Sequence, residues 1–251
     1  MIADNIIQAM ALPQDARISH RVPKKLLLEQ GAPTAADKRY IQDGIEELLW
    51  TAALKPTNIG IASYSDESRE YLEIAVLSMF LRPQAKVQRL IELIHRAIPY
   101  PIVLIVTHDE EQLTLSLAHK RFSQNESGKT VVDGSIVTIV LSPITEMEKT
   151  FLDSFAMTAQ PAQNLFVLYR SWIERIEMLA AARITGRFVP DATPEHSSVR
   201  RKVLTERAQL ERELALLRAQ AAKEKQINRR VDLNLSIKKL EARLKERLAQ
   251  L

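Results

Sequence analysis

The apolar pattern of the first sixty residues favours helices. Between residues 34 and 50, Thr34 is a typical N-cap and Asp37 occupies the capping-box position three residues later. Apolar residues follow at helical spacing, at Ile41, Ile45, Leu48 and Leu49. Pro56 cannot continue a helix. We therefore predict that residues 1 to about 60 are helical with turns, and that the 34–50 helix stops before Pro56.

The next eighty residues show strand-like patterns on either side of one amphipathic helix. Residues 71–82 are rich in apolar side chains and end at Pro83, which is typical of a buried strand. Residues 85–98 place their aliphatic side chains on one helical stripe. Three further strands are predicted at 101–108, 113–122 and 136–143. Strand, helix, strand and hairpin together predict an α/β fold, with α+β as the alternative, whose core is a mixed sheet flanked by helices.

The chain after residue 143 predicts helices separated by one linker. Residues 144 to about 186 have a helical pattern that Gly186 can end. Residues 187–198 contain two prolines and small polar side chains. We therefore predict four parts: a core domain at 1–145, helices packing on it at 146–186, a linker at 187–198 and a basic coiled-coil arm at 199–251.

The arm carries two short coiled-coil seams. It contains no Gly or Pro, and its leucines follow a four-three spacing in two stretches that are out of phase with each other. The predicted seam residues are Leu210, Leu214, Leu217, Leu233, Ile237, Leu240 and Leu244. One long helix with a local change of winding would fit. We favour an antiparallel hairpin bent near residues 223–230, because its two seams can then bury each other.

Composition excludes several classes of site. The chain has no cysteine, which rules out disulfides, thiol nucleophiles and cysteine-bound zinc or iron–sulfur centres. The longest aliphatic run, at residues 102–106, is too short to span a membrane. The first ten residues lack the basic segment of a secretory signal. We expect a cytoplasmic protein without a membrane partner.

Positive charge is concentrated in the arm. The whole chain has a formal net charge of +4, but residues 199–251 hold fifteen basic and seven acidic residues. This asymmetry predicts an acidic partner, either a protein surface or nucleic acid. The candidate binding residues are Arg200, Arg201, Lys202, Lys223, Lys225, Arg229, Arg230, Lys238, Lys239 and Arg243. The simpler interpretation is a solvated coiled-coil exterior.

Candidate catalytic chemistry is sparse. A metal-dependent nuclease would need clustered acids and a lysine to hold a divalent metal and polarise water. The candidates are Glu73, Asp109, His119 and Lys120, but no acid precedes Lys120 on its strand, and no histidine spacing matches a metal motif. A polar sheet edge is the alternative interpretation. The stretch around Tyr100 is interpreted as a helix-to-strand joint, with His95 facing water at the helix end. No metal or other cofactor is predicted outside the nuclease alternative.

Several stretches resemble a known bacterial family. They include "RVPKKLLLEQGAPTAADKRYIQDGIEELLW", "REYLEIAVLSMFLR", "LIHRAIPYPIVLI", "LSLAHKRFSQ" and "AAKEKQINRRVDLNLSIKKLEARL". In order, and over almost the whole chain, they look like the proteins catalogued as domain of unknown function 4391. That resemblance implies an α/β domain with a helical tail, often encoded beside SNF2-type helicases and DNA methyltransferases in restriction-like or anti-phage defence clusters. It supplies no catalytic residues.

Three functional hypotheses follow from the residues and the resemblance together. The first is an accessory, non-catalytic subunit of a DNA-targeting defence system, whose basic tail docks to a helicase or methyltransferase and also contacts DNA. The second is a metal-dependent nuclease or another DNA-processing enzyme of such a system. The third is a homo-oligomer joined through the tail.

Overall fold

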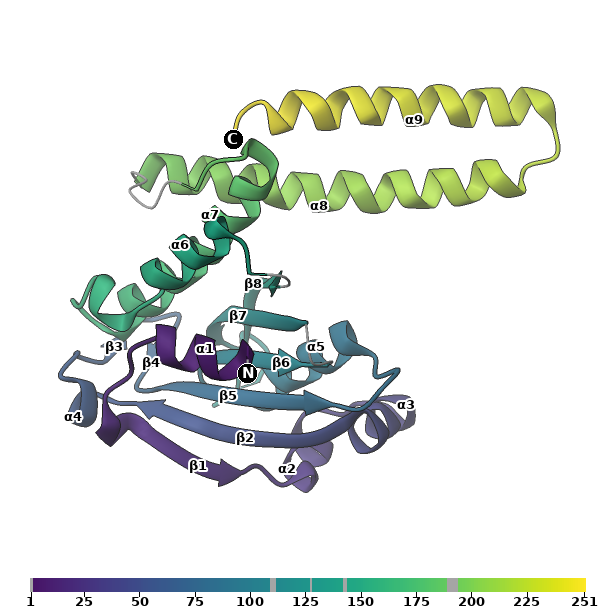
Figure 1. Ribbon diagram of the computed structural model, residues 1–251. Coiled ribbons are helices and arrows are strands. Elements are labelled where there is room, and N and C mark those ends of the chain that lie inside the picture. Colours follow the sequence, from purple (N-terminus) through teal and green to yellow (C-terminus); the bar gives the residue numbers. More distant parts are fainter. Residues whose placement is uncertain (1, 109–111, 127, 142–143, 189–193) are drawn as a thin grey trace. The chain divides into compact units, whose positions relative to one another are not determined.

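Figure 1 shows the computed structural model, which describes residues 2–108, 112–126, 128–141, 144–188 and 194–251. Residues 1–176 and 177–251 form two compact units, which are described separately.

The first unit is built on a six-stranded mixed sheet in the order β1-β2-β5-β6-β7-β8. β5 and β6 are parallel, and every other neighbouring pair in this sheet is antiparallel. The strands are β1 (Arg17–Arg21), β2 (Ile45–Leu54), β5 (Ile74–Leu81), β6 (Ile102–Thr107), β7 (Leu113–Phe122) and β8 (Thr130–Leu141). Two short strands, β3 (Tyr64–Ser65) and β4 (Glu70–Tyr71), pair with each other. The predicted α/β fold with a mixed sheet and helices is confirmed.

One face of the sheet is covered by α2 (Lys24–Gln30) and α5 (Val87–Ala97). α5 joins β5 to β6, so it is the crossover that two parallel strands require. The two helices approach each other closely where Gly31 follows α2. A methyl group added at Gly31 would lie 2.6 Å from the Ala97 side chain, so this position has room only for glycine.

The opposite face carries helices from both ends of the unit. Tyr169 of α7 (Leu165–Thr185) donates its hydroxyl proton to Ile102 O and accepts a hydrogen bond from Ala118 N, which fixes α7 against β6 and β7. α6 (Glu146–Ser154) and α1 (Ile2–Ala9) also belong to this unit, which further contains α3 (Ala35–Arg39) and α4 (Pro56–Ile59). Gly186 follows α7 in the left-handed conformation, as the sequence predicted for a helix end.

The predicted helix at 34–50 is wrong in its second half. Thr34 does cap α3, because its Oγ1 accepts a hydrogen bond from Asp37 N at 3.1 Å. After one π-helical turn at Tyr40–Gly44, however, the chain becomes strand β2. β2 pairs with both β1 and β5, and those two ladders of backbone hydrogen bonds override a local apolar spacing that suits a helix. β1 was likewise not predicted.

The second unit contains a helical hairpin. α8 spans Pro194–Lys223 and α9 spans Ile227–Leu248, and the two run antiparallel side by side (Figure 1). The bend falls at residues 224–226, where Gln226 is extended with φ −80° and ψ 119°. The favoured hairpin is confirmed, and the single long helix is excluded. α8 already begins within the stretch that the sequence suggested as a linker.

Candidate functional site

The seam of the hairpin is filled from within the chain. Leu210 and Leu214 are both 4% exposed, and Leu217 is half-buried. On α9 the seam residues are half-buried, namely Leu233, Ile237, Leu240 and Leu244. Apolar burial of this kind, at about 25 cal/mol for each Å² of apolar area buried, holds the two helices together. The leucine seam therefore holds the hairpin together, while Leu214, Leu244 and Leu248 also line a groove between its two helices.

Two ion pairs cross between the helices. Arg218 Nη2 lies 2.7 Å from Glu241 Oε1, and Arg247 Nε lies 2.9 Å from Glu206 Oε2. Exposed pairs contribute little stability, about 0–1 kcal/mol each. The two pairs lie at different positions along the hairpin and so define the register between α8 and α9.

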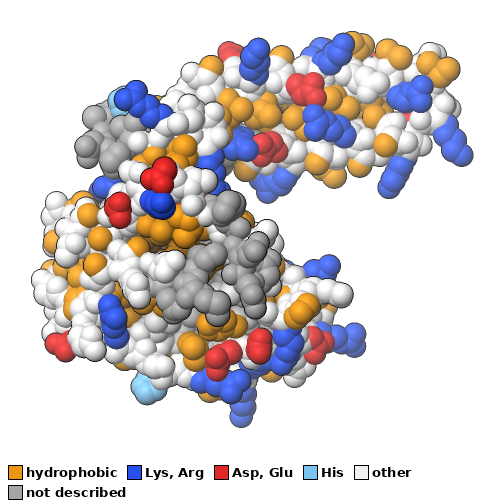
Figure 2. Space-filling view, viewed as in Figure 1, with side chains coloured by type: hydrophobic (Ala, Val, Ile, Leu, Met, Phe, Trp, Pro, Cys, Tyr) orange, Lys and Arg blue, Asp and Glu red, His pale blue; other side chains and the backbone are white. Residues whose placement is uncertain are grey.

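The predicted basic residues divide into two groups. Arg201 is held by the buried Glu177 at 2.8 Å, and Arg200 donates to Ser197 Oγ at 3.1 Å, so both serve the packing of the second unit. The remaining candidates are exposed: Lys202, Lys223, Lys225, Arg229, Arg230, Lys238, Lys239 and Arg243. Figure 2 shows lysine and arginine side chains spread over the visible face of the hairpin.

α9 also carries a second apolar stripe that sequence reasoning missed. Ile227, Val231 and Leu235 are 68%, 50% and 53% exposed. We call these three residues the outer ridge. Their four-residue spacing was the available signal, but the bend predicted near residues 223–230 covered the start of the stripe at Ile227. α9 thus has apolar residues on two sides, and its remaining residues are mostly polar, with seven basic and three acidic.

The predicted catalytic residues do not form one site among those that are described. The Glu73 carboxylate is paired with Lys55 Nζ at 3.1 Å. His119 and Lys120 are neighbours on β7 and point to opposite faces of the sheet, as consecutive strand residues do. Asp109 lies outside the described residues. Within the described ranges, no group of three or more acids and histidines could hold a metal ion.

Lys120 is buried beneath the end of α5. Its ammonium donates to the carbonyl oxygens of His95 and of Ile98, the latter at 2.7 Å. Burial lowers the pKa of Lys120 to about 8. The amine thus satisfies carbonyl groups that α5 leaves unpaired at its C-terminus, where a cation is favoured by the helix dipole. These two contacts account for the burial of the Lys120 ammonium at the end of α5.

The predicted exposure of His95 is wrong. The imidazole is fully buried, and its Nε2 lies 2.9 Å from Ser116 Oγ. Burial and the nearby charge of Lys120 lower the pKa of His95 to about 3. The reason is that His95 lies on the face of α5 that packs against the sheet. The interpretation of the Tyr100 stretch as a joint agrees with the position of residues 98–101 between α5 and β6.

His119 belongs to an aromatic cluster on the α7 face. Its Nδ1 lies 2.7 Å from the Tyr71 hydroxyl, and its ring centroid lies 5.4 Å from that of Phe166 and 5.7 Å from that of Tyr169. Burial raises the pKa of Tyr71. Arg69 lies over the Phe166 ring at 5.1 Å. These described side chains pack against one another and leave no space for a substrate between them.

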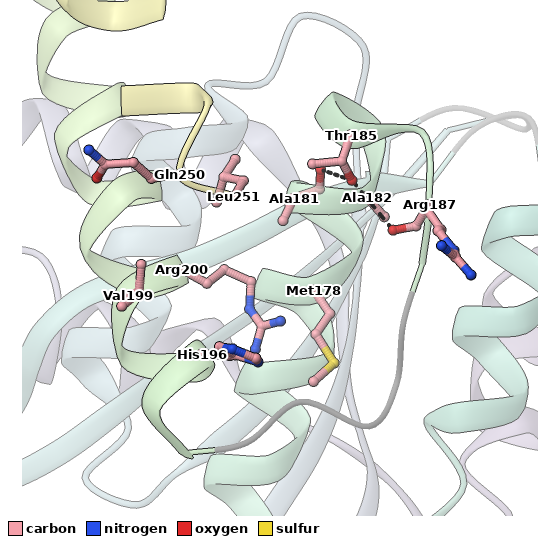
Figure 3. A pocket seen from close by; sticks show the side chains of 10 residues that line it. All are labelled: Met178, Ala181, Ala182, Thr185, Arg187, His196, Val199, Arg200, Gln250 and Leu251. Atoms are coloured by element: carbon pink, nitrogen blue, oxygen red, sulfur yellow. Dashed lines mark hydrogen bonds between the residues drawn. The ribbon is translucent and has the colours of Figure 1, made fainter. Parts of the chain in front are cut away.

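The second unit contains a cavity of about 540 Å³, drawn in Figure 3. Side chains from α7, from α8 and from the residues after α7 and after α9 line it. Half of the described lining residues are apolar, and Arg187 and Arg200 supply positive charge. Among the described residues of the second unit, no carboxylate side chain lines the cavity. The described lining offers packing and positive charge.

Comparison with known proteins gives one match. A family model described as "Domain of unknown function (DUF4391)" matches residues 10–244. No curated protein and no solved structure matches the chain. Among the described residues, no helix has the length and apolar character that crossing a membrane requires.

Proposed function

The chain belongs to the DUF4391 family, and we propose that it is an accessory, non-catalytic subunit of a bacterial DNA-targeting restriction-like or anti-phage defence system. In this proposal the first unit is a scaffold. The hairpin docks to an SNF2-type helicase or a DNA methyltransferase of the same system. The family description assigns no function, so the proposal depends on the residues and on the gene neighbourhoods that the resemblance implies.

One observation carries the proposal: the exposed positive charge of α9. This helix holds seven basic and three acidic residues, and Lys238, Lys239 and Arg243 are all exposed. The seam is already filled by α8, so the cations are not needed to hold the hairpin together. A surface of this kind attracts an acidic partner and accelerates the encounter.

Contact with DNA is part of the same proposal. Each phosphate that a lysine or arginine neutralises releases counterions, so binding weakens steeply with salt. The exposed cations of α8 and α9 could follow a phosphate backbone without reading its sequence. The described residues offer no feature that would select particular bases.

Co-purification with the proteins encoded beside the gene tests the proposal. The full-length chain, tagged, should retain the helicase or the methyltransferase. The triple variant K238Q/K239Q/R243Q should lose that association at physiological salt, because it removes exposed charge without touching the seam. K38Q/R39Q/K86Q is the matched control, since it removes three exposed cations from the first unit. Retention of neither neighbouring protein by the wild-type chain would overturn the proposed function.

A further inference from the structure

The outer ridge lies on the side of α9 that faces away from α8. Val231 and Leu235 are each two residues from the seam residue Leu233, which places them roughly 200° around the helix from it. Ile227 continues the same stripe one turn earlier. The three side chains are between 50% and 68% exposed, so the described residues of the second unit leave this apolar surface uncovered.

We propose that the outer ridge binds a single amphipathic helix of a partner protein, with acidic side chains flanking the apolar stripe of that helix. The inference rests on the proposed function, because it names the chemistry of the partner that the hairpin docks. It differs from that function in assigning the contact to three apolar residues.

The apolar character of the ridge favours protein over nucleic acid. Ile227, Val231 and Leu235 carry only hydrocarbon, which gains nothing from a phosphate backbone but gains about 25 cal/mol for each Å² of apolar area that a partner covers. Contiguous exposed apolar side chains rimmed by polar residues mark sites of protein contact.

The residues around the ridge favour an acidic partner. Asp232 lies three residues before Leu235, and Lys238 and Lys239 lie three and four residues after it, so all three border the ridge. Both lysines are exposed, and in the part of the chain that the structure describes no ion pair or hydrogen bond engages their side chains. Glutamate or aspartate on the flanks of an incoming helix would complement them, which adds specificity and speeds association.

The charge of α9 argues against a second copy of this chain as the occupant. Two copies of α9 would bring like charges together, since each helix has four more basic than acidic residues. Ile227 to Leu235 spans about 12 Å, a length that one partner helix can cover with side chains at every third or fourth position.

Peptide binding to the full-length protein tests the inference. The probe is a fluorescent synthetic helix of about 20 residues with a leucine stripe flanked by glutamate, measured by anisotropy. A second peptide has lysine in place of each glutamate, and a third probe is a DNA duplex. We expect the glutamate peptide to bind, and the lysine peptide to bind at least about tenfold more weakly.

The matched variants isolate the ridge. I227A/V231A/L235A keeps helix-forming residues and should weaken binding of the glutamate peptide by at least about tenfold, with far-ultraviolet circular dichroism unchanged. It should leave DNA binding unaltered. L216A removes a 65%-exposed leucine from α8 and should not affect the peptide. Equal binding of both peptides, or full binding by the ridge variant, would overturn the inference.

Two further outcomes separate this inference from the proposed function. If the helicase or methyltransferase co-purifies with the ridge variant as well as with wild type, the docking function stands and the ridge is not its contact. If light scattering shows a dimer that the ridge variant loses, the occupant is a second copy, and the inference is wrong. Peptide binding through the ridge without retention of either neighbouring protein would instead keep the ridge site and remove the proposed function.

Discussion

Replacing His95 by glutamine should remove most of the acid sensitivity that this residue gives to the first unit. His95 is fully buried on α5, with Nε2 2.9 Å from Ser116 Oγ. Within the described residues its Nδ1 has no hydrogen-bond partner. Burial, and to a smaller extent the charge of Lys120, lower its pKa from 6.5 to about 3. The imidazole is therefore neutral at pH 7, and the fold opposes its protonation.

The sign and size of the effect follow from this pKa. The unfolded chain binds the proton near pH 6.5, whereas the folded chain binds it only near pH 3. The contribution to stability is complete above pH 6.5 and is lost as the pH falls toward 3. Since one pKa unit corresponds to about 1.4 kcal/mol, His95 alone should lower the free energy of unfolding by about 3 kcal/mol between pH 7 and pH 4.

Urea unfolding at pH 7 and pH 4 measures this difference. Trp50 and Trp172 both lie in residues 1–176, so tryptophan fluorescence reports on the first unit. His95→Gln should lose about 3 kcal/mol less than wild type between the two pH values. His20→Gln, which removes an exposed histidine from β1, is the matched control and should follow wild type. If wild type and His95→Gln lose stability in parallel, burial does not keep His95 neutral and the reasoning is refuted.

Three further predictions concern packing. Gly31→Ala should destabilise the first unit by about 1–3 kcal/mol in urea unfolding, because its methyl group would overlap Ala97; unchanged stability would contradict the close approach of α2 and α5. Thr34→Ala should cost about 1 kcal/mol through loss of the α3 cap, with no change in the denaturant slope. Leu214→Ala should lower the free energy of unfolding by about 2–4 kcal/mol, measured by thermal unfolding followed by circular dichroism. Leu216→Ala should lower it by under about 0.5 kcal/mol, since Leu216 is exposed and lies outside the seam. Similar losses for the two variants would argue against the seam.

The parts of the fold that sequence predicted correctly are those where local signals agree. The runs that form β5 and β6 are short and apolar on both faces, with β-branched residues and a nearby proline, whereas the α5 segment is apolar on one stripe. Residues 45–54 were mistaken for helix because Ile45, Leu48 and Leu49 also fit a helical spacing. Pairing with β1 and β5 settled the choice, and such pairing involves residues distant in sequence.

For the candidate functional residues, too, local features were predictable from sequence and contacts between distant segments were not. The exposed cations of α9 were predictable, because charge needs no partner to be recognised in a sequence. The outer ridge was not, since its three apolar residues become informative only when α8 is seen to occupy the other side. Glu73 was named without its partner Lys55, which lies eighteen positions earlier and meets it only in the folded chain.

Spacing alone determined that residues 199–251 form basic helices with a leucine seam, because helical periodicity and charge are local properties. The tertiary structure decided which surfaces remain open. In the folded chain the seam leucines pack between α8 and α9, and Lys120 and His95 are buried at the end of α5. Ile227, Val231 and Leu235 remain exposed. Burial depends on what packs against a side chain, and that is fixed only when distant segments meet.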